Sequence, residues 1–171
     1  MSLEDLGNIG EFVAAVAVVV SLIYLAVQIR QNTSSLRTST FQSAASRASD
    51  FTRAVAEQKE LTHIFRTGLG APEQLEDDDD RLRFVMLLTT VFRHYEDLLF
   101  QYRAGNLSSE SWDAWRYGLR SYFSNPGFPP FWDLRRLSFT ESFRQFVETE
   151  RETTEPLPTL AELAEMIKRA T

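Results

Sequence analysis

Eighteen consecutive uncharged residues near the N-terminus, Phe12 to Ile29, constrain this chain more than any other stretch. Eleven of them are Val, Leu, Ile or Phe. A helix of this length reaches roughly 27 Å, close to the thickness of the hydrocarbon core of a bilayer. On the insertion scale those eleven side chains contribute on the order of −3 to −7 kcal/mol, more than the penalty expected from Ser21 and Gln28. We therefore expect a single transmembrane helix in contact with lipid.

Two other interpretations of the stretch are weaker. A central helix of a soluble bundle would need neighbours on every side, because its surface is apolar almost all round. A cleaved signal peptide would carry Lys or Arg at its start, whereas this chain has Glu4, Asp5 and Glu11 there. We expect the segment to stay attached.

The charges that flank the stretch predict its orientation. No Lys or Arg precedes it, whereas Arg30, Arg37, Arg47 and Arg53 follow it with only Asp50 against them. Positive residues are retained on the cytoplasmic side, and acidic ones have little influence. The sequence therefore predicts an N-terminus outside and a main domain in the cytoplasm.

The rest of the 171-residue chain is long enough for one domain with its own core. The net charge of the whole chain is −6, and this acidic balance argues against nucleic acid as a partner. No cysteine is present, which rules out disulfides, thiolate catalysis and zinc sites built on sulfur. We find no signature of a bound cofactor.

Hydrophobic periodicity predicts an all-α fold: the membrane helix, extended toward the cytoplasm, and then an antiparallel helical bundle. With neither Gly nor Pro between Gly10 and Gly68, the first helix either continues through Asn32–Ser35 or kinks there. An amphipathic helix should run from Leu36 to about Phe65. The expected divisions are residues 1–31 for the tail and span, 32–155 for the helical domain and 156–171 for a C-terminal helix.

Capping patterns mark the later helices. We expect Asp77–Asp80 to begin a central core helix that covers 82–102 and ends at Gly105, and Ser108 to cap the next helix. Ser138 with Glu141, and Thr159 with Glu162, have the spacing of capping boxes. The helix after Pro158 is too short to stand alone, so it should dock on its own domain, on a neighbouring subunit or on a protein partner.

Metal sites receive little support from the sequence. Glu60-x-x-His63 is half of the motif used by di-iron bundles, but no second copy occurs. The four aspartates lack the ligand spacing and the glycine of a calcium loop, so capping explains them better. We predict no metal ligands.

A candidate polar pocket is suggested by charged residues on two of the expected helices. Its members are Arg93, His94, Glu96, Asp97, Arg103, Arg116 and Arg120. Such clusters occur in active sites, but ion pairs between helices look the same in sequence and are the favoured interpretation. Neighbouring aromatics, Trp112, Trp115 and Tyr122 among them, are either a ligand cage or core. No catalytic motif occurs, so we do not expect an enzyme.

Small or polar residues recur three and four positions apart along the first helix, and we call this set the small-residue face. In lipid, such residues let helices approach closely and form hydrogen bonds between them. The face therefore favours a homo-oligomer, with a simple tether and a water-lined channel as the alternatives. Its members are Gly10, Ala14, Ala17, Ser21, Tyr24, Gln28 and Gln31, and the pattern extends from Gly7 to Ala45.

The run LGNIGEFVAAVAVVVSLIYLAVQIRQNT, then FRHYEDLLFQYRAG and a Trp-rich segment ending near FRQFVE, resembles a group of short bacterial membrane proteins of uncharacterised activity. Each has one N-terminal span and a helical domain. The resemblance covers most of the chain to about Val147 and implies a bacterial inner membrane. The resemblance implies no activity. The small-residue face and the candidate polar pocket suggest three functions as hypotheses: an oligomeric scaffold or interaction protein, a channel, and a ligand sensor or enzyme with an Arg-rich pocket.

Overall fold

The computed structural model describes residues 3–153 and 155–170, and within them every regular element is helical. The all-α prediction is therefore confirmed. The helices are α1 (Leu3–Glu57), α2 (Lys59–Gly70), α3 (Asp78–Arg103), α4 (Ser109–Phe123), α5 (Phe128–Arg135), α6 (Glu141–Thr153) and α7 (Leu160–Ala170), with short 3₁₀ turns η1 (Pro72–Gln74) and η2 (Arg136–Ser138).

Helix α1 is continuous through the polar residues Asn32–Ser35, so no kink interrupts it there. The nearby hydroxyls bond back by one turn of the same helix, as Thr33 Oγ1 does to the carbonyl of Ile29 at 2.9 Å. Back-bonded Ser and Thr side chains satisfy their polar atoms without leaving the helix. The structure thus decides between the two alternatives that the sequence left open.

The expected amphipathic helix from Leu36 to Phe65 was wrong in one respect, because the structure breaks it at Gln58. This residue adopts an extended conformation with φ −104° and ψ 103°, and α2 begins after it. The break allows Phe65 of α2 to pack edge-on against Phe51 of α1, with ring centroids 5.6 Å apart. Burial of α2 therefore interrupts a stretch that contains no helix-breaking residue.

The chain divides into two compact units, residues 1–39 and 40–171. In the first, every described side chain from residue 10 to 39 is exposed, and we call this range the exposed segment. It belongs to the one helix in the described part of the chain that is long and apolar enough to cross a membrane. The second unit, which we call the bundle, also includes α7, although the sequence had suggested a separate C-terminal piece.

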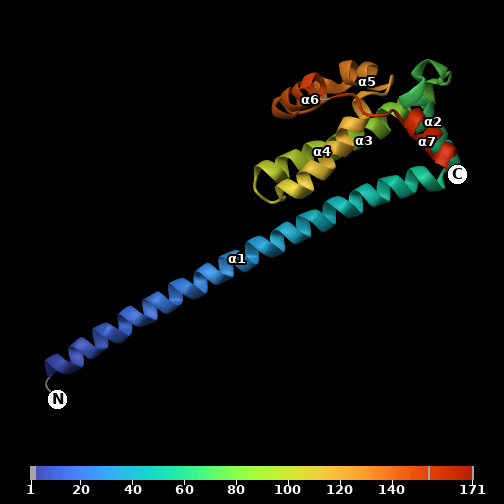
Figure 1. Cartoon of the computed structure of the whole chain (residues 1–171). Coiled ribbons are helices and arrows are strands. Elements are labelled where there is room, and N and C mark those ends of the chain that lie inside the picture. Colours follow the sequence, from blue (N-terminus) through green and yellow to red (C-terminus); the bar gives the residue numbers. More distant parts are fainter. Residues whose placement is uncertain (1–2, 154, 171) are drawn as a thin grey trace. The chain divides into compact units, whose positions relative to one another are not determined.

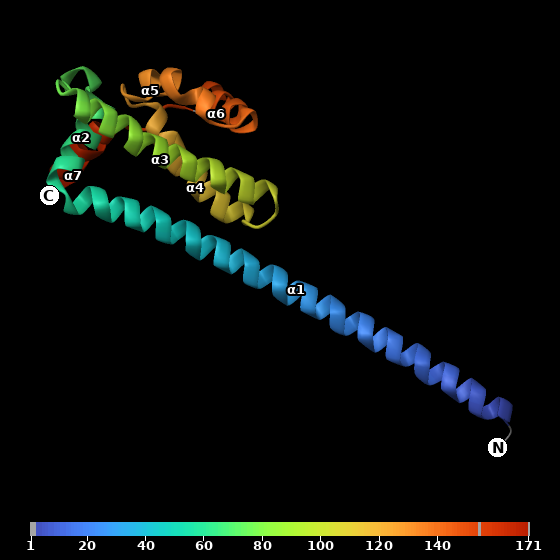
Figure 2. The same ribbon diagram turned by 180° about the vertical axis from the view of Figure 1, so that it is seen from behind.

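Helices α3 and α4 form a hairpin at the centre of the bundle (Figures 1 and 2). Gly105, with φ +75°, follows the last residues of α3 in the left-handed conformation that glycine adopts without a steric penalty. The amide of Asn106 donates back to the carbonyl of Gln101 at 2.9 Å, which closes the turn. The predicted stop of the central helix is confirmed.

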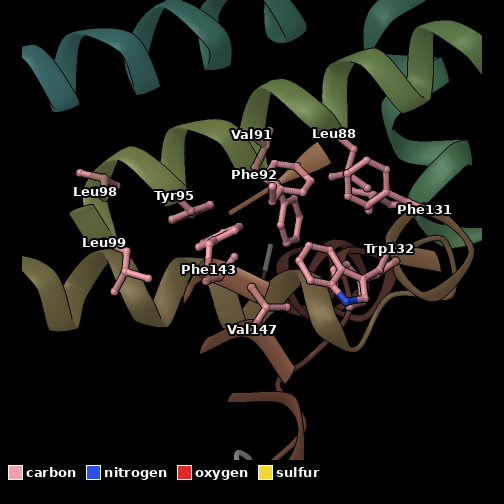
Figure 3. Packing of buried hydrophobic residues seen from close by; sticks show 14 of the residues in the cluster. Leu88, Val91, Phe92, Tyr95, Leu98, Leu99, Phe131, Trp132, Phe143 and Val147 are labelled. Carbon is pink, nitrogen blue, oxygen red and sulfur yellow. The ribbon is translucent and has the colours of Figure 1, made fainter. Parts of the chain in front are cut away.

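The core lies where α3, α5 and α6 meet, and it is dominated by aromatic rings (Figure 3). Phe92 of α3 is fully buried, with ring centroids 5.3 Å from Phe128, 5.3 Å from Phe131 and 5.9 Å from Trp132. Such tilted and offset aromatic pairs add stabilisation beyond the area that they bury. The helix predicted over residues 82–102 therefore does contribute to the core, as expected.

Two glycines permit close backbone approach between α2 and the loop before α5. A Cβ on Gly127 would lie 1.9 Å from the carbonyl oxygen of Gly68, and a Cβ on Gly68 would overlap the ring of Phe84. The amide of Gly127 donates to the carbonyl of Leu69 at 2.8 Å. Gly68 itself lies within α2, which ends two residues later at Gly70, so the absence of a side chain at Gly68 serves packing.

Three of the four predicted caps are confirmed. Asp77 accepts from the amides of Asp79 and Asp80, and Ser108 accepts from the amide of Ser111. Thr159 and Glu162 form a reciprocal capping box, with Thr159 N–H to Glu162 Oε2 at 2.7 Å and Glu162 N–H to Thr159 Oγ1 at 3.2 Å. These caps satisfy amides that the first turn leaves without partners.

The capping box expected at Ser138 and Glu141 was wrong. Ser138 lies in the turn η2, and the amide of Thr140 donates to Glu96 Oε1 of α3 at 2.7 Å. A carboxylate from another helix thus replaces the local cap.

The short helix α7 docks on α2 of its own bundle, one of the three alternatives that the sequence allowed. Asn125, only 1% exposed, accepts the amide of Leu160 at 3.1 Å and donates to the carbonyl of Ser121 at 2.7 Å. This buried side chain joins α4 to the start of α7. The residues of α7 nevertheless all remain exposed, including Met166 at 57%.

Candidate functional site

A cavity of about 1050 Å³, partly open to solvent, lies in the bundle between the C-terminal part of α1 and helices α3, α4 and α6, and we call it the aromatic cavity. Its aromatic lining residues are Phe51, Tyr95, Phe100, Trp115, Tyr122 and Phe143. The charged cluster predicted from the sequence supplies part of its rim, since Arg93, His94, Glu96, Asp97 and Arg103 also line it.

His94 lies against the face of α4, with its ring 5.4 Å from that of Trp115 in an edge-on arrangement. Both ring nitrogens are buried and have no hydrogen-bond partner among the described residues. Burial lowers the pKa of His94, the charge of Arg47 lowers it further, and Asp97 opposes the shift. The ring is therefore held neutral, with one N–H donor and one acceptor nitrogen unused.

The rim of the aromatic cavity is held by ion pairs between elements. Arg47 of α1 donates to Asp97 of α3 at 2.8 Å, and both side chains are substantially exposed, at 60% and 39%. Arg93 pairs with Glu96 one turn later on α3 and also donates to the carbonyl of Ser138 at 2.9 Å. These residues therefore connect α3 to α1 and to the turn before α6.

Arg116 and Arg120 do not line the aromatic cavity, and this corrects their assignment to the predicted pocket. Both point to Glu150 of α6, which is 3% exposed: Arg116 contacts it at 2.8 and 2.6 Å through two nitrogens, and Arg120 at 2.7 Å. Burial raises the pKa of Glu150, but the hydrogen bonds from the two arginines lower it more, so the carboxylate stays ionised. The favoured interpretation, ion pairs between helices, is correct for these two residues.

The pKa values of two tyrosines in the cavity wall are also shifted. Burial raises the pKa of Tyr95, and burial raises the pKa of Tyr122 to about 12. Both phenols therefore keep their protons at neutral pH, and their hydroxyls remain available as hydrogen-bond donors.

The residues weighed as metal ligands take other roles. Glu60 pairs with Arg83 of α3, and His63 is exposed on α2. Among residues 3–153 and 155–170 the structure brings together no group of three or more His, Asp or Glu side chains suited to a metal ion.

The small-residue face lies on the exposed segment of α1. Gly10, Ala14, Ala17, Ser21, Tyr24, Gln28 and Gln31 are all exposed within the single chain. The polar members bond within the helix: Ser21 Oγ donates to the carbonyl of Ala17 at 2.8 Å, and Gln28 Nε2 donates to the hydroxyl of Tyr24 at 2.7 Å. The second bond joins two side chains, so Tyr24 and Gln28 lie on the same side of the helix.

Sequence reasoning missed the contribution of α1 to the cavity. Arg47 was noted only for its charge next to the membrane, and Phe51 only as part of an amphipathic pattern. The opposite sign of Arg47 and Asp97 was visible, but nothing indicated that two residues fifty positions apart would meet. Trp115 and Tyr122 had been left as either cage or core, and the structure places them in the cavity wall.

No protein family, curated protein or solved structure matches the chain.

Proposed function

We propose that this chain is a single-span protein of the bacterial inner membrane, and that its first helix both anchors the bundle and assembles several copies into a scaffold. The observation that carries this proposal is the exposure of the whole segment from residue 10 to 39. Phe12, Leu22 and Ile23 expose 70, 61 and 60% of their surface. Apolar surface on this scale needs a covering, and a bilayer provides one.

The small-residue face supports assembly. Gly10, Ala14 and Ala17 allow a second helix to approach closely. The hydroxyl of Ser21 and the amide of Gln28, now bonded within the helix at 2.8 and 2.7 Å, can exchange these partners for groups on a neighbouring helix. We infer a homo-oligomer because identical helices present identical small-residue faces to one another.

The positive charges after the span support a cytoplasmic bundle. Protease added to sealed inverted vesicles, which expose the cytoplasmic side, should digest the bundle, whereas protease outside intact spheroplasts should leave it whole. The reverse pattern would contradict the orientation.

The mass of the purified chain in a mild detergent tests assembly. We expect an oligomer, and we expect Ala14→Leu with Ala17→Leu to reduce it to a monomer, because two larger side chains keep the helices apart. Ala15→Leu with Ala26→Leu is the matched control, since these alanines lie on the opposite side of the helix. Membrane insertion should persist in both variants because each adds apolar surface.

If the wild-type chain is a monomer, the first helix serves only as a membrane tether. If the mass of the Ala14→Leu/Ala17→Leu variant is unchanged, the interface does not include the small-residue face. A channel remains the alternative for an assembly that encloses an axis. Its test is conductance of the intact oligomer in a planar bilayer, and absence of conductance would remove it.

A protein partner of α7 belongs to the same proposal. This helix is held at its start by Asn125, while Met166 farther along is 57% exposed. A scaffold that gathers bundles also gathers these helices, so α7 is the element through which we expect a partner to bind.

A further inference from the structure

We infer that the aromatic cavity binds a small aromatic molecule without net charge that forms a hydrogen bond with one ring nitrogen of His94. This goes beyond the proposed scaffold and does not depend on oligomerisation. The cavity lies wholly within the bundle and is formed by residues from Arg47 to Phe143.

The size and the walls of the cavity suit a small molecule. Sites for such ligands are typically about 300–1000 Å³ and combine apolar, aromatic walls with a few polar groups. This cavity has about 1050 Å³, with Phe51 on one side and Trp115 and Tyr122 on another. Phe51 and Phe65 already form an edge-on pair at 5.6 Å, and Tyr122 lies 6.5 Å from Phe65. A planar ring can extend this aromatic network.

The hydrogen bond that we expect the ligand to form involves His94. Its two ring nitrogens lie out of reach of water, yet neither has a partner in the described structure. A buried polar atom without a partner costs free energy that a new hydrogen bond recovers. The ring of His94 itself lines the cavity, so a ligand that turns it toward the cavity supplies a hydrogen bond that the buried nitrogens lack in the described structure.

The charges around the cavity argue against an ionic ligand. Its lining contains three arginines and three carboxylates: Arg47, Arg93, Arg103, Asp50, Glu96 and Asp97. Arg47 is paired with Asp97 and Arg93 with Glu96. An anion would have to compete with carboxylates already bound to those arginines, and a cation would meet as many positive charges as negative ones. A molecule without net charge meets neither obstacle.

Benzimidazole is the probe that combines these properties, because it is aromatic and has one N–H donor and one acceptor nitrogen. We expect it to bind the full chain in lipid nanodiscs and to shift the imidazole ¹⁵N signals of His94. The sequence contains only two histidines. The exposed His63 on α2, outside the cavity, therefore serves as an internal reference whose signals should not move.

Three further probes test separately whether the ligand must be aromatic and whether it must be uncharged. Cyclohexanecarboxamide has hydrogen-bonding groups without an aromatic ring, 2-naphthoate is an aromatic anion, and benzamidine is an aromatic cation. Each should bind more weakly than benzimidazole, by about tenfold or more, a difference of about 1.4 kcal/mol. Tighter binding of either charged probe would overturn the inferred charge, and equal binding of cyclohexanecarboxamide would overturn the aromatic preference.

Variants test whether the probe binds in the aromatic cavity. Ala48→Trp fills the cavity from α1 and should abolish binding, while Ser46→Trp, at an exposed position outside the lining, should leave it unchanged. His94→Phe keeps a ring but removes both nitrogens, and it should weaken benzimidazole about five- to tenfold, the value of one ordinary hydrogen bond. Unchanged affinity in His94→Phe would remove His94 from the site. Failure of all four probes to shift His94, with the wild-type fold intact by circular dichroism, would overturn the inference.

Discussion

The exposed segment and the bundle contain the same kinds of apolar side chains in opposite surroundings. Phe12 in the first is 70% exposed, whereas Phe92 and Phe143 in the second are completely buried. In the bundle, α3, α5 and α6 cover one another's aromatic rings. In the exposed segment no described part of the chain covers the apolar surface, and lipid and other copies are the covering that we propose. Hydrophobicity alone therefore does not define a core, because it also matters which neighbours the chain itself supplies.

The largest difference should come from removing one phenylalanine ring from each of the two regions. Phe92→Ala should lower the free energy of unfolding of the bundle by about 3–5 kcal/mol, because it removes a ring packed against Phe128, Phe131 and Trp132 and leaves a cavity. Phe12→Ala should leave that quantity unchanged. Chemical denaturation in nanodiscs, followed by near-ultraviolet circular dichroism, measures both. Equal losses would show that the exposed segment is part of the same cooperative unit.

A smaller effect on the free energy of unfolding should distinguish a buried carboxylate of the bundle from an exposed one. Glu150→Gln should lower the free energy of unfolding by about 1–3 kcal/mol, since it weakens charge-assisted hydrogen bonds from Arg116 and Arg120 at a buried site. Glu148→Gln is the matched control, because its pair with Arg136 is 3.7 Å long and nearly half exposed. Such surface pairs contribute about 0–1 kcal/mol. Equal losses in the two variants would contradict a special role for Glu150.

The smallest effect concerns pH and His94. Burial, and then the charge of Arg47, hold the pKa of His94 below its ordinary value. The unfolded chain therefore takes up a proton first as the pH falls, and stability is lost from about pH 6.5 down to the pKa of the folded protein. His94→Phe should flatten the dependence of unfolding free energy on pH in this window. The same slope in wild type and variant would show that His94 is not its source.

Much of the bundle was predictable because the signals are local. Phe84, Leu88 and Tyr95 recur at helical spacing on the predicted core helix, and all three are buried. Asp77 and Ser108 satisfy the first amides of their own helices, and Gly105 ends α3 through its own backbone conformation. Each of these features depends on residues within one or two turns, so each can be predicted from spacing alone.

The candidate site was only partly predictable because it depends on distant residues. Arg93, His94, Glu96 and Asp97 share one helix and were grouped correctly, but Arg116 and Arg120 leave the group for Glu150, which lies thirty or more positions away. The break at Gln58 and the capping of Thr140 by Glu96 have the same origin. Local patterns favoured a continuous helix and a cap at Ser138, and packing of α2 and α6 overrode both.

The order of amino acids was enough to establish that the chain is helical and that residues 12–29 form an uncharged apolar helix of membrane-spanning length. Helical period, caps and the absence of charge are properties of neighbouring residues, so they required no knowledge of the fold. Three-dimensional packing was needed to show that α7 docks on α2, and that Phe51, His94 and Trp115 surround one cavity. Those outcomes depend on which surfaces meet when the helices of the bundle pack, and residues far apart in the chain supply those surfaces.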